Sequence, residues 1–493
     1  MKKIYGNYRH VDRGSCSTVI IGKNASATGR VILGHNEDDE ECYVQAHLVP
    51  HLKHKEGEMI VFDDGKAVIP QVPETAAYFW TDVKCLGGIS FADCFINEYG
   101  VAVATDSCRP SKDIYEGKAD NREAYGLAYA LRTLIAERAT SARHGVEVAM
   151  ELIEKFGYVS ARTYHIADKN EAWALQVPKG FNAVARRIGD DEVYYMPNHF
   201  TIHEIDFDDH DNFIVSPGLV THAIEAGWYT PAKEGDYSDF DFAAAYQFGE
   251  NQYANVHRAQ GAWYLLTGEM IPEEKIKRFS AKATRKYTID DVKKVLRFHY
   301  EGMEMDHTEG GKLNPHRGYR TVNTICNNVT VESMIFDFAD DPIDTKMYRA
   351  LPKPCLSPFT PWYPLALAKI PHAYEHLNTV AAKGSHFDAG EDEMKYDPTK
   401  AWWIFKTVQW FTDLNYRFTH TLISERIAEI EKKWDAELPA IDKTYAALKE
   451  TDPEAAKKFL ADYTAAQAQN VLDHTLDLID YMANRRIRED KYD

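Results

Sequence analysis

The sequence lacks paired cysteines. It contains 7 cysteines in 493 residues, an odd number without any Cys-x-x-Cys pair, which is neither a disulfide framework nor a zinc pattern. Lone thiols scattered along a chain are typical of proteins from a reducing compartment. Residues 1–15 also contain no apolar core of a secretory signal, so the sequence predicts a cytoplasmic protein.

Long apolar runs and an excess of basic residues are missing as well. No stretch approaches the roughly 18 apolar residues that a membrane-spanning helix requires. The formal net charge is −19, which argues against a nucleic-acid-binding surface and against binding to anionic membranes. We therefore expect neither a membrane nor a nucleic acid as a partner.

Known metal-binding patterns are absent too. The 20 histidines form no His-Glu-x-x-His pair or comparable spacing. The acidic segment at 206–212 lacks the alternating ligands, central glycine and terminal glutamate of an EF-hand loop. We therefore expect no catalytic metal and no other cofactor.

What the sequence does have is a distinctive stretch at residues 16–38. Two short runs of aliphatic and β-branched residues, 17–21 and 31–33, flank a polar turn that contains glycine, and this pattern predicts a β-hairpin. The start of one antiparallel strand lies beside the end of its partner. Cys16 should therefore lie near the polar cluster that closes the second strand, which consists of His35, Asn36, Glu37 and Asp38. Taken alone, such a cysteine is more often a packed core residue than a nucleophile.

Further along, strands and helices alternate. Residues 94–105 predict a second hairpin, in which Asn97 has a structural role in the turn. Residues 121–156 show apolar residues at helical spacing, with a break at 140–141. β-Rich runs separated by polar turns over 164–196 predict a four-stranded meander, and residues 253–266 predict a helix.

The last third of the chain is predicted to change from strands to helices. Residues 319–324 and 331–338 are typical of strands, and the proline-rich tract 352–371 is typical of loops. Residues 401–493 carry two long amphipathic helical patterns separated at Asp452-Pro453. We expect this region to pack on the preceding domain or to serve in homo-oligomerisation.

Two stretches carry a resemblance to a known family. The first, within 16–38, reads Cys-Ser-Thr, Gly-Lys-Asn-Ala-Ser and Gly-His-Asn-Glu-Asp. The second, within 160–206, includes Ala-Trp, Val-Ala-Arg-Arg and Asn-His-Phe-Thr-Ile-His-Glu-Ile-Asp. Both resemble the C69 dipeptidases, which are N-terminal nucleophile hydrolases related to secernins and to bile-salt and penicillin V acylases. The resemblance extends over roughly residues 16–400.

The resemblance implies an α+β fold, the four-layer αββα sandwich of the N-terminal nucleophile hydrolases, with a C-terminal helical extension. It implies a pro-segment at 1–15, a catalytic domain at 16–400 and the extension at 401–493. Autocatalytic removal of the pro-segment would make Cys16 the first residue of the mature enzyme.

The resemblance also implies the residues of the site. Cys16 would be the nucleophile, and its freed α-amine, with an ordinary pKa of about 7.7–8, would be the general base. Asp38 would hold that amine, and Asn198 would donate to the oxyanion or bond to the amine. Arg258 would neutralise negative charge, such as a substrate carboxylate, although a structural salt bridge fits this arginine equally well.

Two positions depart from the acylase relatives. Their Arg-Asn is replaced here by His35 and Asn36, so that a permanent cation becomes a titratable imidazole. After the second hairpin, where bile-salt acylases have an oxyanion asparagine, this chain offers Asp106 or Ser107.

These expectations predict a cysteine dipeptidase whose partner is a small peptide substrate. An amidase or acylase that acts on non-peptide amides is one alternative. A secernin-like protein without peptidase activity, which would use its helical tail as an interaction surface, is another.

Overall fold

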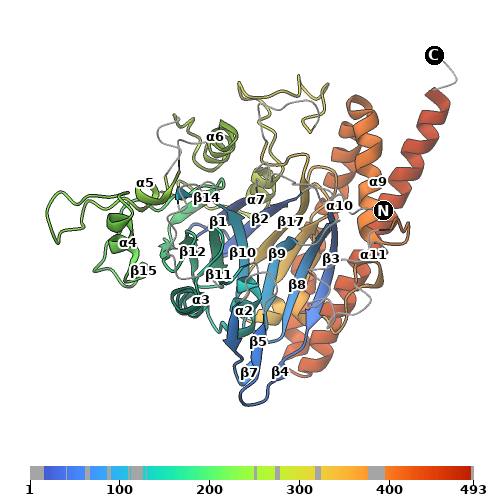
Figure 1. Ribbon diagram of the computed structural model, residues 1–493. Helices are drawn as coiled ribbons and strands as arrows, with labels where there is room; N and C mark the ends of the chain where they lie inside the picture. The colour runs from blue at the N-terminus through green and yellow to red at the C-terminus, as the bar shows by residue number, and fades with distance from the viewer. Residues whose placement is uncertain are drawn as a thin grey trace, which may run out of the picture.

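In the computed structural model, the described residues are 16–39, 42–61, 67–85, 90–108, 111–112, 126–128, 130–248, 253–272, 278–316, 324–375 and 395–489. The expected pro-segment and most of the strand expected at 319–324 lie outside these ranges. The described part is a mixed α/β structure with antiparallel sheets and a helical C-terminal region (Figure 1).

Two large antiparallel sheets form its centre. The seven-stranded sheet has the order β16-β14-β1-β2-β17-β18-β19, with bounds Ser280–Lys282, Glu192–Met196, Ser17–Ile21, Ile32–Asp38, Thr330–Asp337, Lys346–Ala350 and Thr360–Trp362. The eight-stranded sheet has the order β15-β13-β12-β11-β10-β9-β8-β3, with bounds Phe213–Val215, Val184–Ile188, Ala172–Val177, Arg162–Ala167, Ala102–Ser107, Ser90–Asn97, Tyr78–Cys85 and Cys42–Val49. Two small ribbons pair β4 (Leu52–Lys53) with β7 (Glu74–Thr75) and β5 (Met59–Val61) with β6 (Val68–Pro70).

The helices surround the two sheets, and Figure 1 labels them in chain order. Their bounds are α2 Leu131–Arg138, α3 Ala142–Phe156, α4 Leu219–Glu225, α5 Phe242–Tyr246, α6 Tyr253–Thr267, α7 Ile289–Leu296, α9 Ala401–Leu414, α10 Tyr416–Lys449 and α11 Pro453–Glu489. Single 3₁₀ turns occur at Pro342–Asp344, Pro364–Ala366 and His372–Tyr374.

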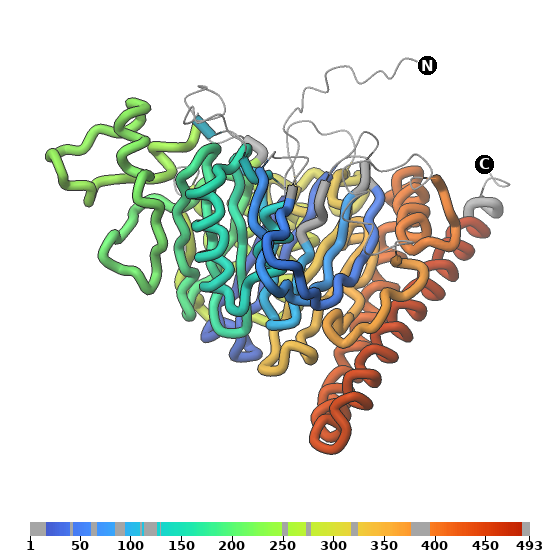
Figure 2. The backbone as a smooth tube through the Cα atoms, turned by 60° about the horizontal axis from the view of Figure 1, so that its bottom comes forward, coloured from blue at the N-terminus to red at the C-terminus, as the bar shows by residue number. Residues whose placement is uncertain are grey.

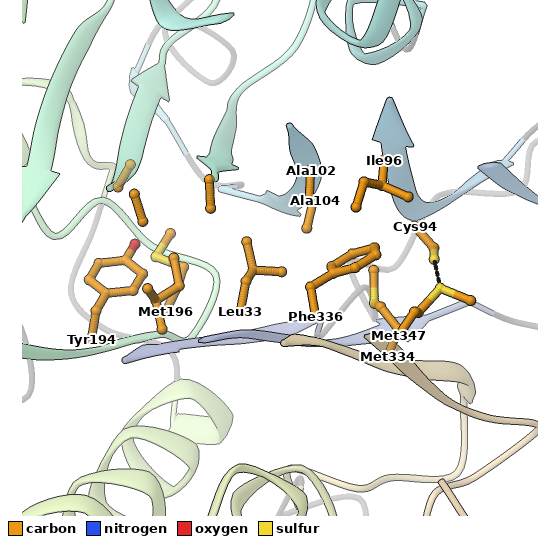
Figure 3. Packing of buried hydrophobic residues seen from close by; sticks show 14 of the residues in the cluster. Leu33, Cys94, Ile96, Ala102, Ala104, Tyr194, Met196, Met334, Phe336 and Met347 are labelled. Atoms are coloured by element: carbon orange, nitrogen blue, oxygen red, sulfur yellow. Dashed lines mark hydrogen bonds between the residues drawn. The ribbon is translucent and has the colours of Figure 1, made fainter. Parts of the chain in front are cut away.

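The main core lies between the two sheets. Figure 3 shows Leu33 of β2, Met196 of β14 and Phe336 of β17 pointing from one sheet towards Ile96 and Ala104 of the other. Alternate residues of a strand point to opposite faces, so the intervening residues point to the outer face of each sheet. Helices pack on these outer faces, and strands such as β1 and β12 are therefore buried along their whole length.

Each sheet has its own helical cover. α2 and α3 pack on the eight-stranded sheet, where Leu131, Val146 and Ile153 share a buried cluster with Trp80 and Trp173. α6 and α7 pack on the seven-stranded sheet through a second buried cluster, which includes Val19, Trp263, Val292 and Leu296. The apolar residues at helical spacing therefore provide the faces that complete both sheets.

Most of the predicted local elements are confirmed. The first hairpin is β1 and β2, and the second is β9 and β10. Asn97 has the structural role expected of it, because its amide donates to the carbonyl oxygens of Ala136 and Ala139 while its side-chain oxygen accepts from the turn. Of the helix predicted from 121, the described part is α2, Leu131–Arg138, and Ser141 caps the next helix, α3. Residues 113–125 and 129 lie outside the described part.

The predicted four-stranded meander is wrong in its last strand. β11, β12 and β13 are consecutive neighbours, but β14 crosses to the other sheet and pairs with β1. Both faces of β14 are apolar: Tyr194 and Met196 enter the core between the sheets, whereas Val193 and Tyr195 pack under the helices. Such a strand is best buried in the interior of a sheet, and its crossing brings the residues after Met196 to Cys16.

The C-terminal region is helical, as predicted. Figure 2 shows α10 and α11 side by side along one flank of the sheets. Asp452 accepts a hydrogen bond from the backbone of Ala455, which begins α11 after the predicted break at Pro453. Trp402 of α9 and Trp434 of α10 join the core between the sheets. No helix in the described ranges combines the length and the apolar character needed to span a bilayer.

Candidate active site

Cys16 lies directly before β1 and beside the end of β2, as the hairpin pattern predicts. Ser17 pairs with Asn36 across the hairpin, and Thr18 pairs with His35. The thiol is buried, and its Sγ lies 3.9 Å from Glu37 Oε1 and 3.9 Å from the backbone oxygen of Asp38. The hairpin alone therefore brings a sulfur atom next to the carboxylate of Glu37.

These surroundings favour the protonated thiol. Burial raises the pKa of Cys16 well above its ordinary value, and the carboxylates of Glu37, Asp38 and Asp106 raise it further. A thiolate is the nucleophilic form of cysteine. In this arrangement the thiol needs a base close to the sulfur before it can attack a carbonyl group.

Asp38 is buried and only partly paired. Its Oδ2 accepts a hydrogen bond from the Asn327 amide, whereas its buried Oδ1 has no hydrogen-bond partner among the described residues. Burial raises the pKa of Asp38 from 3.8 to about 7, while Thr330, Asn327 and Arg258 act in the opposite direction. At the end of β2 there is thus a buried carboxylate oxygen with capacity for one more donor.

Arg258 comes from α6, the helix predicted for this segment, and its side chain is fully buried. Nη1 donates to the backbone oxygen of Cys16 at 2.9 Å and to Ser17 Oγ at 3.1 Å. Nη2 donates to Asn198 Oδ1 at 2.6 Å and to Asn255 Oδ1 at 2.7 Å. The guanidinium therefore connects the start of β1 to the segment after β14.

Asn198 adopts a backbone conformation that few residues tolerate. Its φ of 58° lies in the left-handed region, where asparagine is several-fold enriched over other non-glycine residues. The side-chain oxygen accepts from Arg258, and Nδ2 donates to the Ser107 backbone oxygen at 2.9 Å. Because an amide NH₂ group has two donors, one N–H can serve another acceptor.

A buried polar layer lies behind the thiol, between the two sheets. Thr18 Oγ1 donates to Asp106 Oδ2 at 2.5 Å and lies 2.8 Å from His35 Nδ1. His165 Nδ1 lies 3.3 Å from the same Asp106 oxygen, and His35 Nε2 lies 3.6 Å from Glu37 Oε2. This layer gives the buried His35 ring polar neighbours, because Asp106 lies beside Nδ1 and Glu37 lies beside Nε2.

Asn36 faces the opposite side of β2. Its Nδ2 donates to the backbone oxygens of Leu296 at 2.9 Å and Ile325 at 3.1 Å, and its oxygen accepts from Ser333 Oγ at 2.6 Å. Period-two alternation places it away from the thiol. Asn36 therefore ties β2 to the neighbouring segments and does not converge on the sulfur.

The structure thus brings Cys16, Asp38, Asn198, Arg258 and His35 together and sends Asn36 to the other face. The sequence reasoning missed Thr18, His165 and Asn327. Alternation along β1 places Thr18 on the same face as Cys16, so this signal was available. His165 and Asn327 meet the site only through pairing between distant segments, which leaves no local signal.

Two groups of side chains in the described ranges bring potential metal-ligand atoms within 4.8 Å of one another. One is Cys16, His35 and Glu37, within the candidate active site. The other is His299, His316, Cys326 and Cys355, in a separate part of the fold.

Comparison with known proteins identifies a family whose model matches most of this chain. Residues 15–429 match the model for peptidase family C69. A probable dipeptidase B of Lactococcus lactis subsp. lactis (strain IL1403) is 26% identical over 419 residues, which cover 82% of each chain. A probable dipeptidase of Latilactobacillus sakei is 25% identical over 362 residues, 72% of this chain and 75% of that protein. A probable dipeptidase A of Streptococcus pyogenes serotype M18 (strain MGAS8232) is 22% identical over 495 residues, 97% and 98% of the two chains.

Proposed function

The chain belongs to peptidase family C69, and on this premise we propose that it is a dipeptidase that hydrolyses small peptides with Cys16 as its nucleophile. The names of the similar proteins support the substrate class. The observation that carries the proposal is the convergence at Cys16 of the end of β2, where the Asp38 backbone oxygen lies 3.9 Å from Sγ, and of Arg258, which donates to the Cys16 backbone oxygen and to Asn198.

In this proposal the missing base is created by cleavage. Removal of residues 1–15 converts the backbone nitrogen of Cys16 into an α-amine, whose ordinary pKa of about 7.7–8 suits proton transfer near neutral pH. The unpartnered Oδ1 of Asp38 would accept a hydrogen bond from that amine and orient it towards the sulfur. The buried carboxylate and the protonated amine would then stabilise each other's charges.

The reaction would proceed through a thioester. The α-amine takes the Cys16 proton as Sγ attacks the peptide carbonyl, and the same proton passes to the leaving amine when the C–N bond breaks. Water then attacks the thioester, the α-amine takes a proton from it, and the thiol and the acid product are released. The second N–H of Asn198 would donate to the oxyanion in both halves of the reaction.

Arg258 is not proposed to bind a substrate carboxylate, although its charge alone would suit that role. Because the guanidinium is buried and both terminal nitrogens bind protein oxygens, we assign it a positioning role for Cys16 and Asn198. His35 would likewise hold Thr18 and Glu37 behind the thiol. Asn36 would hold β2 in place from the other face.

We also assign the fold to the N-terminal nucleophile hydrolase sandwich, with the catalytic domain at 16–400 and the helical extension at 401–493. Two antiparallel sheets face each other, helices cover both outer faces, and the cysteine opens a strand in the interior of one sheet. This arrangement of sheets and helices supports the assignment of a four-layer αββα order.

The test combines intact mass, N-terminal sequencing and a substrate panel. We expect a mature chain that begins at Cys16 and hydrolyses dipeptides, and we expect Cys16→Ala to abolish both properties. Cys94→Ala is the matched control, because this thiol is buried elsewhere in the core against Met347. A full-length chain that remains inert towards dipeptides would contradict the proposal. Hydrolysis of acyl-amides in preference to dipeptides would instead identify an amidase.

A further inference from the structure

A second group of ligand-type side chains lies outside the candidate active site. His299 follows α7, His316 lies in the loop beyond it, Cys326 precedes β17, and Cys355 lies between β18 and β19. One ligand atom from each of the four lies within 4.8 Å of the corresponding atoms of the others. The sequence separations of 17, 10 and 39 between His316 and the other three match no linear metal motif.

The distances fit a tetrahedral metal ion. With bonds of about 2.3 Å to sulfur and about 2.05 Å to nitrogen, a tetrahedral zinc site has edges of about 3.3 Å between nitrogens and about 3.6 Å between nitrogen and sulfur. Here the Nε2 atoms of His299 and His316 are 3.1 Å apart. His316 Nε2 lies 3.7 Å from Cys326 Sγ and 3.8 Å from Cys355 Sγ.

The surroundings are those of a metal site as well. Nδ1 of His299 lies 2.9 Å from Glu301 Oε1, which holds the ring with Nε2 directed at the other three residues. A carboxylate on the outer nitrogen is the usual partner of a metal-binding histidine. A cavity of about 600 Å³ reaches the cluster and includes His299 and Cys355 in its lining. It provides an entry path for an ion.

We propose that His299, His316, Cys326 and Cys355 bind one Zn²⁺ ion in a closed Cys₂His₂ site. Two thiolates and two imidazoles arranged as a tetrahedron are typical of structural zinc, and two thiolates balance the charge of the ion. Binding releases the two thiol protons to solvent. Because all four positions are filled by protein ligands, the ion has no open position for a substrate.

The ion would hold the segment that supports the candidate active site. Ile325 and Asn327 flank Cys326; the first accepts a hydrogen bond from Asn36 and the second donates to Asp38. The backbone N–H of Cys326 also donates to the backbone oxygen of Phe298, the residue before His299. The zinc site itself is independent of the proposed function, whereas its effect on Asp38 rests on that function.

The first test is the metal content of the purified full chain. We expect about one Zn²⁺ per chain after dialysis, with loss of most of it in His316→Ala and in Cys355→Ser. His420→Gln is the matched control, because His420 lines the same cavity without belonging to the cluster. Cys16→Ala should keep its zinc, which separates this proposal from failure of the dipeptidase proposal. Zinc that persists in both ligand variants would refute the site.

A second test does not depend on the folding of any variant. When Co²⁺ replaces the ion in the wild-type chain, we expect thiolate-to-cobalt charge-transfer absorption and the intense visible bands of tetrahedral cobalt. Two cysteines should also become reactive towards alkylation only after chelation. A chain without bound metal and without the cobalt spectrum, or one in which Cys326 and Cys355 form a disulfide, would overturn the proposal.

Discussion

The Arg258 guanidinium donates a 2.6 Å hydrogen bond to the side-chain oxygen of Asn198, a residue 60 positions earlier in the chain. The same guanidinium donates to the backbone oxygen of Cys16. One buried cation therefore sets the position of the candidate nucleophile and the orientation of the amide beside it. Disturbing it should change the rate of reaction more than the binding of substrate.

Arg258→Lys should lower kcat while leaving KM nearly unchanged. A lysine ammonium keeps the charge but cannot reproduce the planar fork that serves four acceptors. We expect kcat on a dipeptide to fall by about tenfold or more and the free energy of unfolding to fall by about 2 kcal/mol, from lost hydrogen bonds to a charged group. Steady-state kinetics and urea denaturation measure the two effects.

The control for this variant is Arg278→Lys. Arg278 lies over the ring of Trp263, a residue of α6 like Arg258, but Arg278 is outside the candidate site. Its replacement should therefore leave kcat unchanged. If Arg258 bound a substrate carboxylate instead, KM would rise and kcat would be retained. That result would contradict the positioning role.

Asn198→Asp tests the donor proposed for the oxyanion. The substitution preserves the shape of the side chain and an oxygen for Arg258, but it replaces both N–H donors by an acceptor. Loss of one preorganised donor should reduce kcat by about 100-fold. Rate measurements on mature protein check this, with the exposed Asn470→Asp as a control that should retain activity.

Unprocessed protein should lose stability as pH rises towards neutrality. Burial raises the pKa of Asp38 from 3.8 to about 7, so between these values the folded chain holds a proton that the unfolded chain has released. The free energy of unfolding then falls as pH rises through this window, by up to about 4 kcal/mol. Chemical denaturation of Cys16→Ala, which we expect to stay uncleaved, at acidic and neutral pH measures the slope.

Adding Asp38→Asn to that background should flatten the dependence, whereas replacing the exposed Asp480 should not. In the mature chain an α-ammonium group beside Asp38 would favour its ionised form and weaken the fall. A slope in the uncleaved chain that is indifferent to Asp38→Asn would mean that another group titrates there.

Thr18→Val should destabilise the polar layer between the sheets. The hydroxyl donates to Asp106 and contacts His35, and valine has nearly the same shape without that donor. A buried carboxylate that loses a hydrogen bond costs about 1–3 kcal/mol. Thermal unfolding measures the loss. Thr444→Val on α10, where the hydroxyl is exposed and bonds only within the helix, should change stability much less.

Much of the local structure could be predicted because it depends on neighbouring residues. The hairpin around residues 17–38 follows from two apolar runs and a glycine-containing turn, and it places Cys16 beside the polar end of β2. The break at Ser141 and the start of α11 at Pro453 follow from capping and from the geometry of proline. The motifs in the first hairpin and before Asp206 indicated the family that the comparison found.

The tertiary structure alone decided which distant segments meet. No local pattern in residues 192–196 predicts that β14 leaves the meander and pairs with β1. The burial of both faces of β14 decides this pairing. As a result, Asn198 reaches Arg258. In the same way, Cys326 and Cys355 meet two histidines only after β17 and β18 have packed. Sequence therefore determined the elements and the candidate nucleophile, whereas long-range burial, which no short window records, determined the partners of that nucleophile.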